Sequence, residues 1–135
     1  MRLFVYGTLR KGRYNYDIYL KDNSKFLQNA YIKGTLYSLK GKVYPAIVEG
    51  DSMVLGEIFE VDQETFNRMD AMEGYVPGRF DNEYDKIETD ILDENGQVID
   101  RLPVYWYNIK PEAQKNLLDQ VIESGDYVAY MLDHD

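Results

Sequence analysis

Val5-Tyr6-Gly7-Thr8-Leu9-Arg10 ends the first apolar run of the chain and is the stretch on which its fold depends. Residues 3–6 have the short apolar pattern of a buried strand, and Gly7 permits the chain to turn directly after it. A turn in this position can present several backbone N–H groups to an anion. It lacks the glycine spacings of nucleotide P-loops and dinucleotide-binding folds, so neither class is supported. Taken alone, the stretch is more often an ordinary strand end than a binding turn.

Glu73 lies at the predicted end of a helix over residues 63–72. Asp62 is expected to cap the start of this helix, and Gly74 fits the position just beyond its end. A carboxylate in the last helical turn faces the partial negative charge of unpaired carbonyls, which raises its pKa, as partial burial also would. A raised pKa suits a group that both accepts and donates a proton. The alternative is a solvated surface glutamate, one of 24 acidic residues.

Composition removes several kinds of chemistry. The 135 residues contain no cysteine and one histidine, His134, next to the C-terminal residue. Disulfides, thiol nucleophiles and thiolate metal sites are therefore excluded, and histidine-dependent nucleophiles or metal sites are disfavoured. Any reaction is expected to use carboxylates, tyrosines, lysines, hydroxyl groups or backbone amides.

The charge balance also narrows the possible partners. A net charge of −9 and a pI near 4.6 disfavour nucleic acid and anionic membranes. We see neither a signal peptide pattern nor an apolar stretch of about 18 residues, and expect a single cytoplasmic domain over residues 1–135. Arg10, Lys11 and Arg13 form a small basic island, for which attraction of an anionic substrate and plain solvation of a loop both remain open. The acidic residues around Gly96 fit a solvated hairpin better than a calcium loop.

The remaining pattern favours strands with a few helices among them. An edge strand is expected around Pro45, because proline cannot donate to a ladder, and Gly56 marks a bulge or a close approach. Asn95-Gly96 predicts a hairpin turn with positive φ at both residues. Strands are predicted at residues 30–39, 43–48, 54–61, 84–92 and 98–107, and helices at about 14–22, at 63–72 and from Pro111 to Gly125. This order fits an α+β fold.

Seven sequence elements together resemble a known family over nearly the whole chain. They are Val5-Tyr6-Gly7-Thr8-Leu9-Arg10, Tyr44-Pro45-Ala46, Val54-x-Gly56-Glu57-Ile58, Asp70-x-x-Glu73-Gly74-Tyr75, the Tyr84 strand, Val104-Tyr105-x-Tyr107 and Ser124-Gly125-Asp126-Tyr127. In this order they resemble the γ-glutamylcyclotransferase-like superfamily, on its γ-glutamylamine cyclotransferase and AIG2-like side.

The resemblance implies a small mixed β-barrel flanked by two or three helices and a reaction without a cofactor. The α-amino group of a small γ-glutamyl compound attacks its own side-chain amide carbonyl, which gives 5-oxoproline and a free amine. The family glutamate falls on Glu73, as general acid and base. The family's substrate-binding turn falls on Tyr6, Gly7, Thr8 and Leu9, and Tyr84 and Tyr105 are candidate pocket walls.

One departure from the family pattern concerns Lys86, where many relatives carry an arginine whose planar fork a lysine cannot replace. Two other functions remain open for the same fold. One is a catalytically inactive protein that binds a γ-glutamyl or other carboxylate ligand. The other is an interaction module that binds a protein through a tyrosine-rich face.

Overall fold

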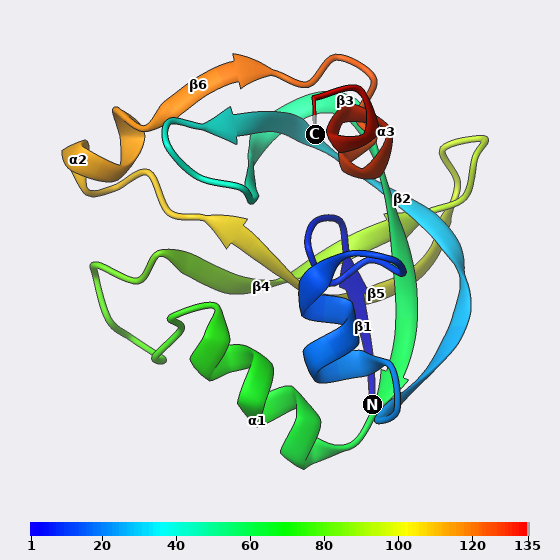
Figure 1. Ribbon diagram of the computed structural model, residues 1–135. Helices are drawn as coiled ribbons and strands as arrows, with labels where there is room; N and C mark the ends of the chain where they lie inside the picture. The colour runs from blue at the N-terminus through cyan, green and yellow to red at the C-terminus, as the bar shows by residue number, and fades with distance from the viewer. Residues whose placement is uncertain (135) are drawn as a thin grey trace.

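The computed structural model describes residues 1–134, apart from the side chain of His134 (Figure 1). The strands form one six-stranded sheet of order β1-β3-β2-β4-β5, with β6 paired to β2. The elements in chain order are β1 (Arg2–Val5), the π-helix η1 (Tyr16–Leu20), β2 (Ser24–Leu39), β3 (Pro45–Val61), α1 (Gln63–Met72), β4 (Tyr84–Leu92), β5 (Val98–Tyr107), α2 (Glu112–Lys115), β6 (Leu118–Val121) and α3 (Tyr127–His134). The predicted α+β class is confirmed.

The sheet differs from the predicted mixed barrel in two respects. Every strand pair is antiparallel, so the sheet is not mixed. The hydrogen-bonded order begins at β1 and ends at β5 without closing, so a barrel is not confirmed. The two edges nevertheless lie close together. The hydroxyl of Tyr6, the residue after β1, donates a hydrogen bond of 2.5 Å to the carbonyl of Tyr105 in β5.

Strands β2 and β3 are longer than their sequence patterns predicted. The two segments expected at residues 43–48 and 54–61 form one strand, β3, whose residues 57–60 lie between β1 and β2. The prediction of an edge strand around Pro45 is confirmed for the start of β3. At its start Pro45 pairs with Ser38 of β2, and within residues 1–134 no strand pairs with its other side, as a proline requires. Gly56 marks a close approach, since a Cβ atom there would lie 2.3 Å from the carbonyl oxygen of Val5.

Helix α1 has the predicted bounds and caps. The Asp62 carboxylate accepts a hydrogen bond from the backbone N–H of Thr65 at 2.8 Å, and Gly74 has a φ of +68° just beyond the last turn. In Figure 1 the helix lies below β4 and beside the blue η1. Asp62 and Gly74 therefore fix where the chain leaves the helix, which is the position of Glu73.

The prediction of a last helix from Pro111 to Gly125 is wrong. Helix α2 has only four residues, with Pro111 as its N-cap, and the following segment forms β6. Strand β6 pairs with β2, where Val121 lies opposite Tyr37, and the Ile122 N–H donates to the Leu36 carbonyl at 2.7 Å. The free side of β2 offers hydrogen-bond partners to the backbone of residues 118–122. This pairing decides in favour of a strand, although the spacing of the apolar residues also suits a helix. Helix α3, which the sequence pattern missed, follows Gly125.

The hairpin between β4 and β5 is present, but its predicted turn geometry is wrong. Among the described residues only glycines have a positive φ, so Asn95 does not share the +82° of Gly96. The Asp93 carboxylate accepts hydrogen bonds from the N–H groups of Asn95 and Gln97, which favours this other geometry.

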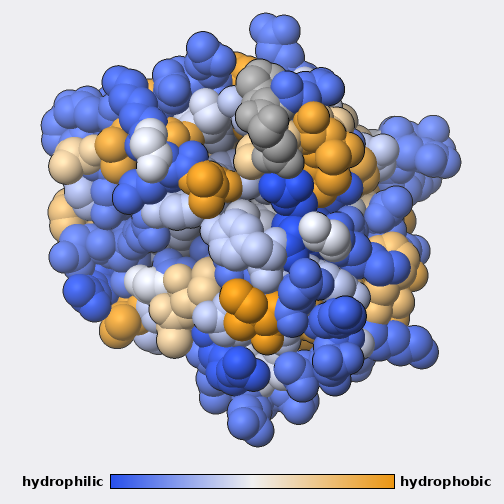
Figure 2. Space-filling view, viewed as in Figure 1, coloured by the Kyte–Doolittle hydropathy of each residue, from blue (hydrophilic) through white to orange (hydrophobic). Residues whose placement is uncertain are grey.

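The core occupies both faces of the sheet because side chains alternate along each strand. Leu3 and Val5 of β1 pack with Phe59 and Met69 on one face, whereas Phe4 packs in a second cluster on the other. The face shown in Figure 2 is mainly hydrophilic, with small, scattered hydrophobic groups. No helix within residues 1–134 is long and apolar enough to cross a membrane.

Candidate active site

A cavity of about 350 Å³ opens where the turn after β1 meets the end of α1 and the start of β4. It brings together every residue that the sequence singled out for the site. These are Tyr6, Gly7, Thr8, Leu9, Glu73, Tyr84 and Tyr105. The other lining residues are Phe4, Val5, Tyr14, Asn15, Tyr44, Pro45, Met72 and Glu83. Residues far apart in the chain therefore share one concave site, the usual form of a small-molecule site.

Glu73 is the most perturbed carboxyl group of the cavity. It is the C-cap of α1, half-buried, and its N–H donates to the Met69 carbonyl at 2.9 Å. Removal from water is the largest cause, and together with the charges of Glu83 and Asp70 it raises the pKa of Glu73 to about 8. The helix end predicted a raised pKa for Glu73, but its largest cause in the structure is burial. A carboxyl group with this pKa exchanges a proton near neutral pH.

The turn after β1 is held by hydrogen bonds to its carbonyl and hydroxyl groups. The Gly7 carbonyl accepts from Arg10 N–H at 3.0 Å, and the Thr8 carbonyl accepts from Tyr16 N–H at 3.1 Å. The Thr8 hydroxyl accepts from the buried amide of Asn15 at 2.7 Å. Within residues 1–134 the N–H groups of Gly7, Thr8 and Leu9 have no hydrogen-bond acceptor. These donors are thus available to an anionic group of a ligand.

Three tyrosines form the inner wall, and each hydroxyl group donates a hydrogen bond of 2.5 Å to a protein oxygen. Tyr6 donates to the Tyr105 carbonyl, Tyr84 to the Pro45 carbonyl, and Tyr105 to the Asp70 carboxylate. Burial raises the pKa of all three hydroxyl groups well above the usual value of tyrosine. They therefore stay neutral and fix the shape of the cavity.

Arg10, the first residue of the basic island, does not line the cavity. Arg10 is only 7 % exposed, and its guanidinium contacts Glu57 at 3.0 Å and Asp126 at 2.8 Å. Plain solvation is equally wrong for this residue, whose charge is used inside the protein. The lining of the cavity, as far as residues 1–134 show, includes no lysine, arginine or histidine.

Lys86 binds the carboxylate of Asp70 rather than lining the cavity. Its ammonium group lies 2.9 and 3.1 Å from the two Asp70 oxygens, and Asp70 in turn accepts the hydrogen bond of Tyr105. The ammonium also lies 4.5 Å from the centre of the Phe66 ring. Lysine thus supports the cavity wall from behind without the planar fork of arginine.

Glu83 and Tyr44 are two of the eight lining residues that were not predicted from the sequence. The Tyr44 hydroxyl donates to the Glu83 carboxylate at 2.7 Å, and both residues are half-buried. The Tyr44-Pro45-Ala46 element was a signal for the first, but no local pattern distinguishes Glu83 from other glutamates. Its position depends on how β4 begins.

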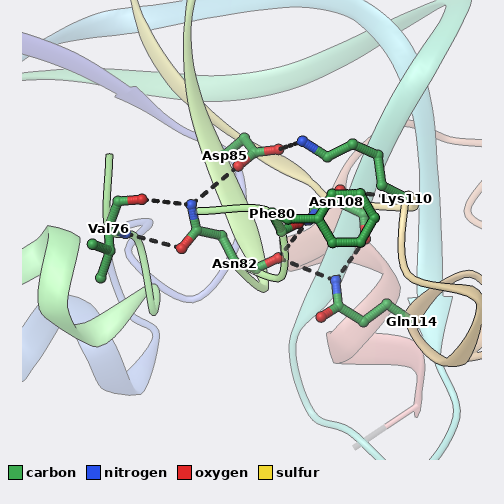
Figure 3. A network of polar contacts seen from close by, with 7 residues as sticks. All are labelled: Val76, Phe80, Asn82, Asp85, Asn108, Lys110 and Gln114. Atoms are coloured by element: carbon green, nitrogen blue, oxygen red, sulfur yellow. Dashed lines mark hydrogen bonds and ion pairs between the residues drawn. The ribbon is translucent and has the colours of Figure 1, made fainter. Parts of the chain in front are cut away.

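A polar network fixes the loop before β4 (Figure 3). The Asn82 side chain bonds both the N–H and the carbonyl of Val76, at 3.0 and 2.9 Å. The Asn108 amide donates to the carbonyls of Phe80 and Asn82 at 2.8 Å, and Gln114 bonds the carbonyls of Asn82 and Asn108. The Asn108 N–H also donates to the Glu83 carbonyl at 3.0 Å, so the network extends to the cavity rim.

A metal site is not evident in the described part of the chain. Among the side chains that the structure describes, no group of three Asp or Glu could hold a metal ion.

Comparison with known proteins identifies similar chains. Residues 3–129 match the family described as "Gamma-glutamyl cyclotransferase, AIG2-like". A protein of Methanocaldococcus jannaschii named "Putative gamma-glutamylcyclotransferase" is 35 % identical over 130 residues, which cover 95 % of this chain and 96 % of that one. The γ-L-glutamyl-butirosin B γ-glutamyl cyclotransferase of Niallia circulans is 39 % identical over 95 residues, 70 % of this chain and 60 % of that one.

The fold agrees with solved structures. The crystal structure of an uncharacterized protein of Pyrococcus horikoshii superposes with a TM-score of 0.71 and 31 % identity, covering 99 % of this chain and 95 % of that one. A mouse AIG2-like protein superposes with a TM-score of 0.66 at 21 % identity, covering 91 % and 88 % of the two chains. The second comparison supports the fold alone.

Proposed function

The chain belongs to the γ-glutamyl cyclotransferase, AIG2-like family, and from this premise we propose that it converts a γ-glutamyl amine or γ-glutamyl amino acid to 5-oxoproline and a free amine. The observation that carries the proposal is the position of Glu73. Its carboxyl group, with a pKa of about 8, lines the same cavity as a turn whose N–H groups lack acceptors within residues 1–134. A proton-exchanging group beside donors for an anion is the minimal set of groups for an acyl-transfer site.

Glu73 acts twice in the proposed reaction. As carboxylate it accepts a proton from the α-amino group of the substrate, whose nitrogen then bonds to the γ-carbonyl carbon and closes a five-membered ring. As carboxylic acid it returns the proton to the leaving nitrogen while the bond from that nitrogen to the carbonyl carbon breaks. Atoms and charges balance without a cofactor, and one group with a pKa near the working pH serves both steps.

The turn at residues 7–9 supports this reaction by holding the glutamyl end. Its N–H groups are suited to the substrate α-carboxylate or to the oxygen that becomes negative during attack. The attack is intramolecular, so a cavity that holds the glutamyl chain folded supplies much of the acceleration through orientation.

The test is an assay for 5-oxoproline with a panel of γ-glutamyl amines and γ-glutamyl amino acids. Product from any member supports the proposal, and the best member identifies the amine. Thermal stabilisation by panel members without product would instead support the inactive binding protein.

The pH dependence of kcat/KM gives a prediction of its own. Only the ionised Glu73 accepts a proton, so kcat/KM is expected to rise about tenfold per pH unit until the pH reaches about 8. Initial rates at low substrate concentration, from pH 5.5 to 9 at constant ionic strength, measure this limb. A limb centred near 4.5, the usual pKa of glutamate, would contradict the assignment.

A further inference from the structure

The cavity has a buried inner wall and a more exposed rim. Thr8 and Leu9 of the turn are less than 10 % exposed, whereas Tyr14 is 45 % exposed and Tyr44 and Glu83 are half-buried. If the glutamyl end binds at the turn, the amine half of the substrate extends toward the rim. It then passes the side chains of Tyr14, Tyr44 and Glu83.

Glu83 presents a carboxylate to this path without a cation beside it. Within residues 1–134 the carboxylate accepts a hydrogen bond from the hydroxyl of Tyr44 at 2.7 Å. No lysine or arginine nitrogen of those residues lies within 4.0 Å of the carboxylate. The buried carboxylate of Glu57 is paired with Arg10, and Asp70 is paired with Lys86. Glu83 is thus a charged side chain at the cavity that the proposed reaction does not use.

The carboxylate is also held in place. The Asn108 N–H donates to the Glu83 carbonyl at 3.0 Å, and the network of Figure 3 fixes the preceding loop. Tyr44 bonds one carboxylate oxygen, Oε2, which leaves Oε1 able to accept from a ligand. A carboxylate whose position is fixed in advance binds a cation with little ordering cost.

We propose that Glu83 binds a positive charge on the amine half of the substrate, so that the chain acts on γ-glutamyl derivatives of diamines and polyamines in preference to uncharged amines. This inference rests on the proposed function. The rings of Tyr14 and Tyr44 line the same rim and favour a cation through their faces. In a γ-glutamyl dipeptide, the amine half of the substrate is an amino acid with a free carboxylate, which the Glu83 carboxylate repels.

A bound cation would also act on the acid/base group. The negative charge of Glu83 is one cause of the raised pKa of Glu73. A cation that neutralises this charge lowers the pKa of Glu73 and increases the ionised fraction at neutral pH. A charged amine half therefore assists both binding and proton transfer.

The test compares two substrates of the same length and shape. One is γ-glutamyl-5-aminopentylamide, which ends in an ammonium group, and the other is γ-glutamyl-hexylamide, which ends in a methyl group. The native chain is expected to prefer the charged substrate by at least about tenfold in kcat/KM, and Glu83→Gln to reduce this ratio about tenfold. The control Glu88→Gln removes an exposed charge of the same strand β4 and is expected to keep the native ratio.

The outcomes separate the two proposals. A native ratio of one or less, or a ratio that Glu83→Gln leaves unchanged, overturns the role of Glu83. Equal loss on both substrates is one such outcome, because the ratio then keeps its native value. Absence of 5-oxoproline from every substrate overturns the proposed function instead, and thermal stabilisation by the same two compounds then tests cation binding alone.

The native chain provides a measurement that does not depend on a folded variant. Raising ionic strength from 0.05 to 0.5 M screens charge at a half-exposed rim. It is expected to lower kcat/KM for the charged substrate several-fold more than for the neutral one. An equal response of the two substrates would count against the proposal.

Discussion

Replacing Glu73 by glutamine is expected to lower kcat/KM for 5-oxoproline formation about a thousandfold. The amide has nearly the shape of the carboxyl group but neither accepts the proton of the attacking amine nor returns it to the leaving amine. General acid–base catalysis typically contributes 10²–10⁴-fold, and here one residue serves both transfers. The measurement is the initial rate at pH 8 with the best substrate of the panel, beside Glu64→Gln on the first turn of α1. Native-like turnover by Glu73→Gln would remove Glu73 from the mechanism.

The same variant carries an internal control for folding. Because the pKa of Glu73 is raised from 4.5 to about 8, the folded chain binds more protons than the unfolded chain between these pH values. Stability of the native protein therefore falls as pH rises through this window, by a few kcal/mol at about 1.4 kcal/mol per pKa unit. Glutamine does not titrate, so Glu73→Gln is expected to have the higher Tm at pH 9. A Tm below the native value at pH 9 would show that the lost activity reflects a damaged fold.

Local signals explain which parts of this site the sequence predicts. Asp62 and Gly74 mark the two ends of α1 because both residues suit helix caps, and the position of Glu73 follows from them. Gly7 marks the end of β1 for an equally local reason. At these residues the local structure does not depend on the rest of the fold.

Glu83 and β6 show what the local signals leave out. Glu83 reaches the cavity because the Asn82–Asn108 network fixes the loop before β4, and that network joins residues about 26 positions apart. The apolar residues of β6 have a spacing that also suits a helix, and only the free side of β2 decides between the two. The open sheet is a third case, because closure depends on the relation of β1 to β5 rather than on any single strand.

The second large effect is expected at the buried ion pair behind the turn. Arg10→Met is expected to lower the free energy of unfolding by about 3–5 kcal/mol, because it leaves the carboxylate of Glu57, 5 % exposed, without its countercharge. Urea denaturation at pH 7 measures the change. The matched control is Arg79→Met, since the Arg79–Asp81 pair is 57 % and 64 % exposed and is expected to contribute less than about 1 kcal/mol.

A double variant shows whether the cost is the unpaired charge or lost packing. Arg10→Met combined with Glu57→Leu removes both buried charges, and is expected to be more stable than Arg10→Met alone. Equal stability would assign the cost to the shape of the arginine stem. The pair also joins the turn to its surroundings, since Lys11 N–H donates to Glu57 at 2.8 Å and Arg10 contacts Asp126 beyond β6. If the unpaired charge explains the loss, the buried ion pair stabilises the segment that directly follows the turn at residues 7–9.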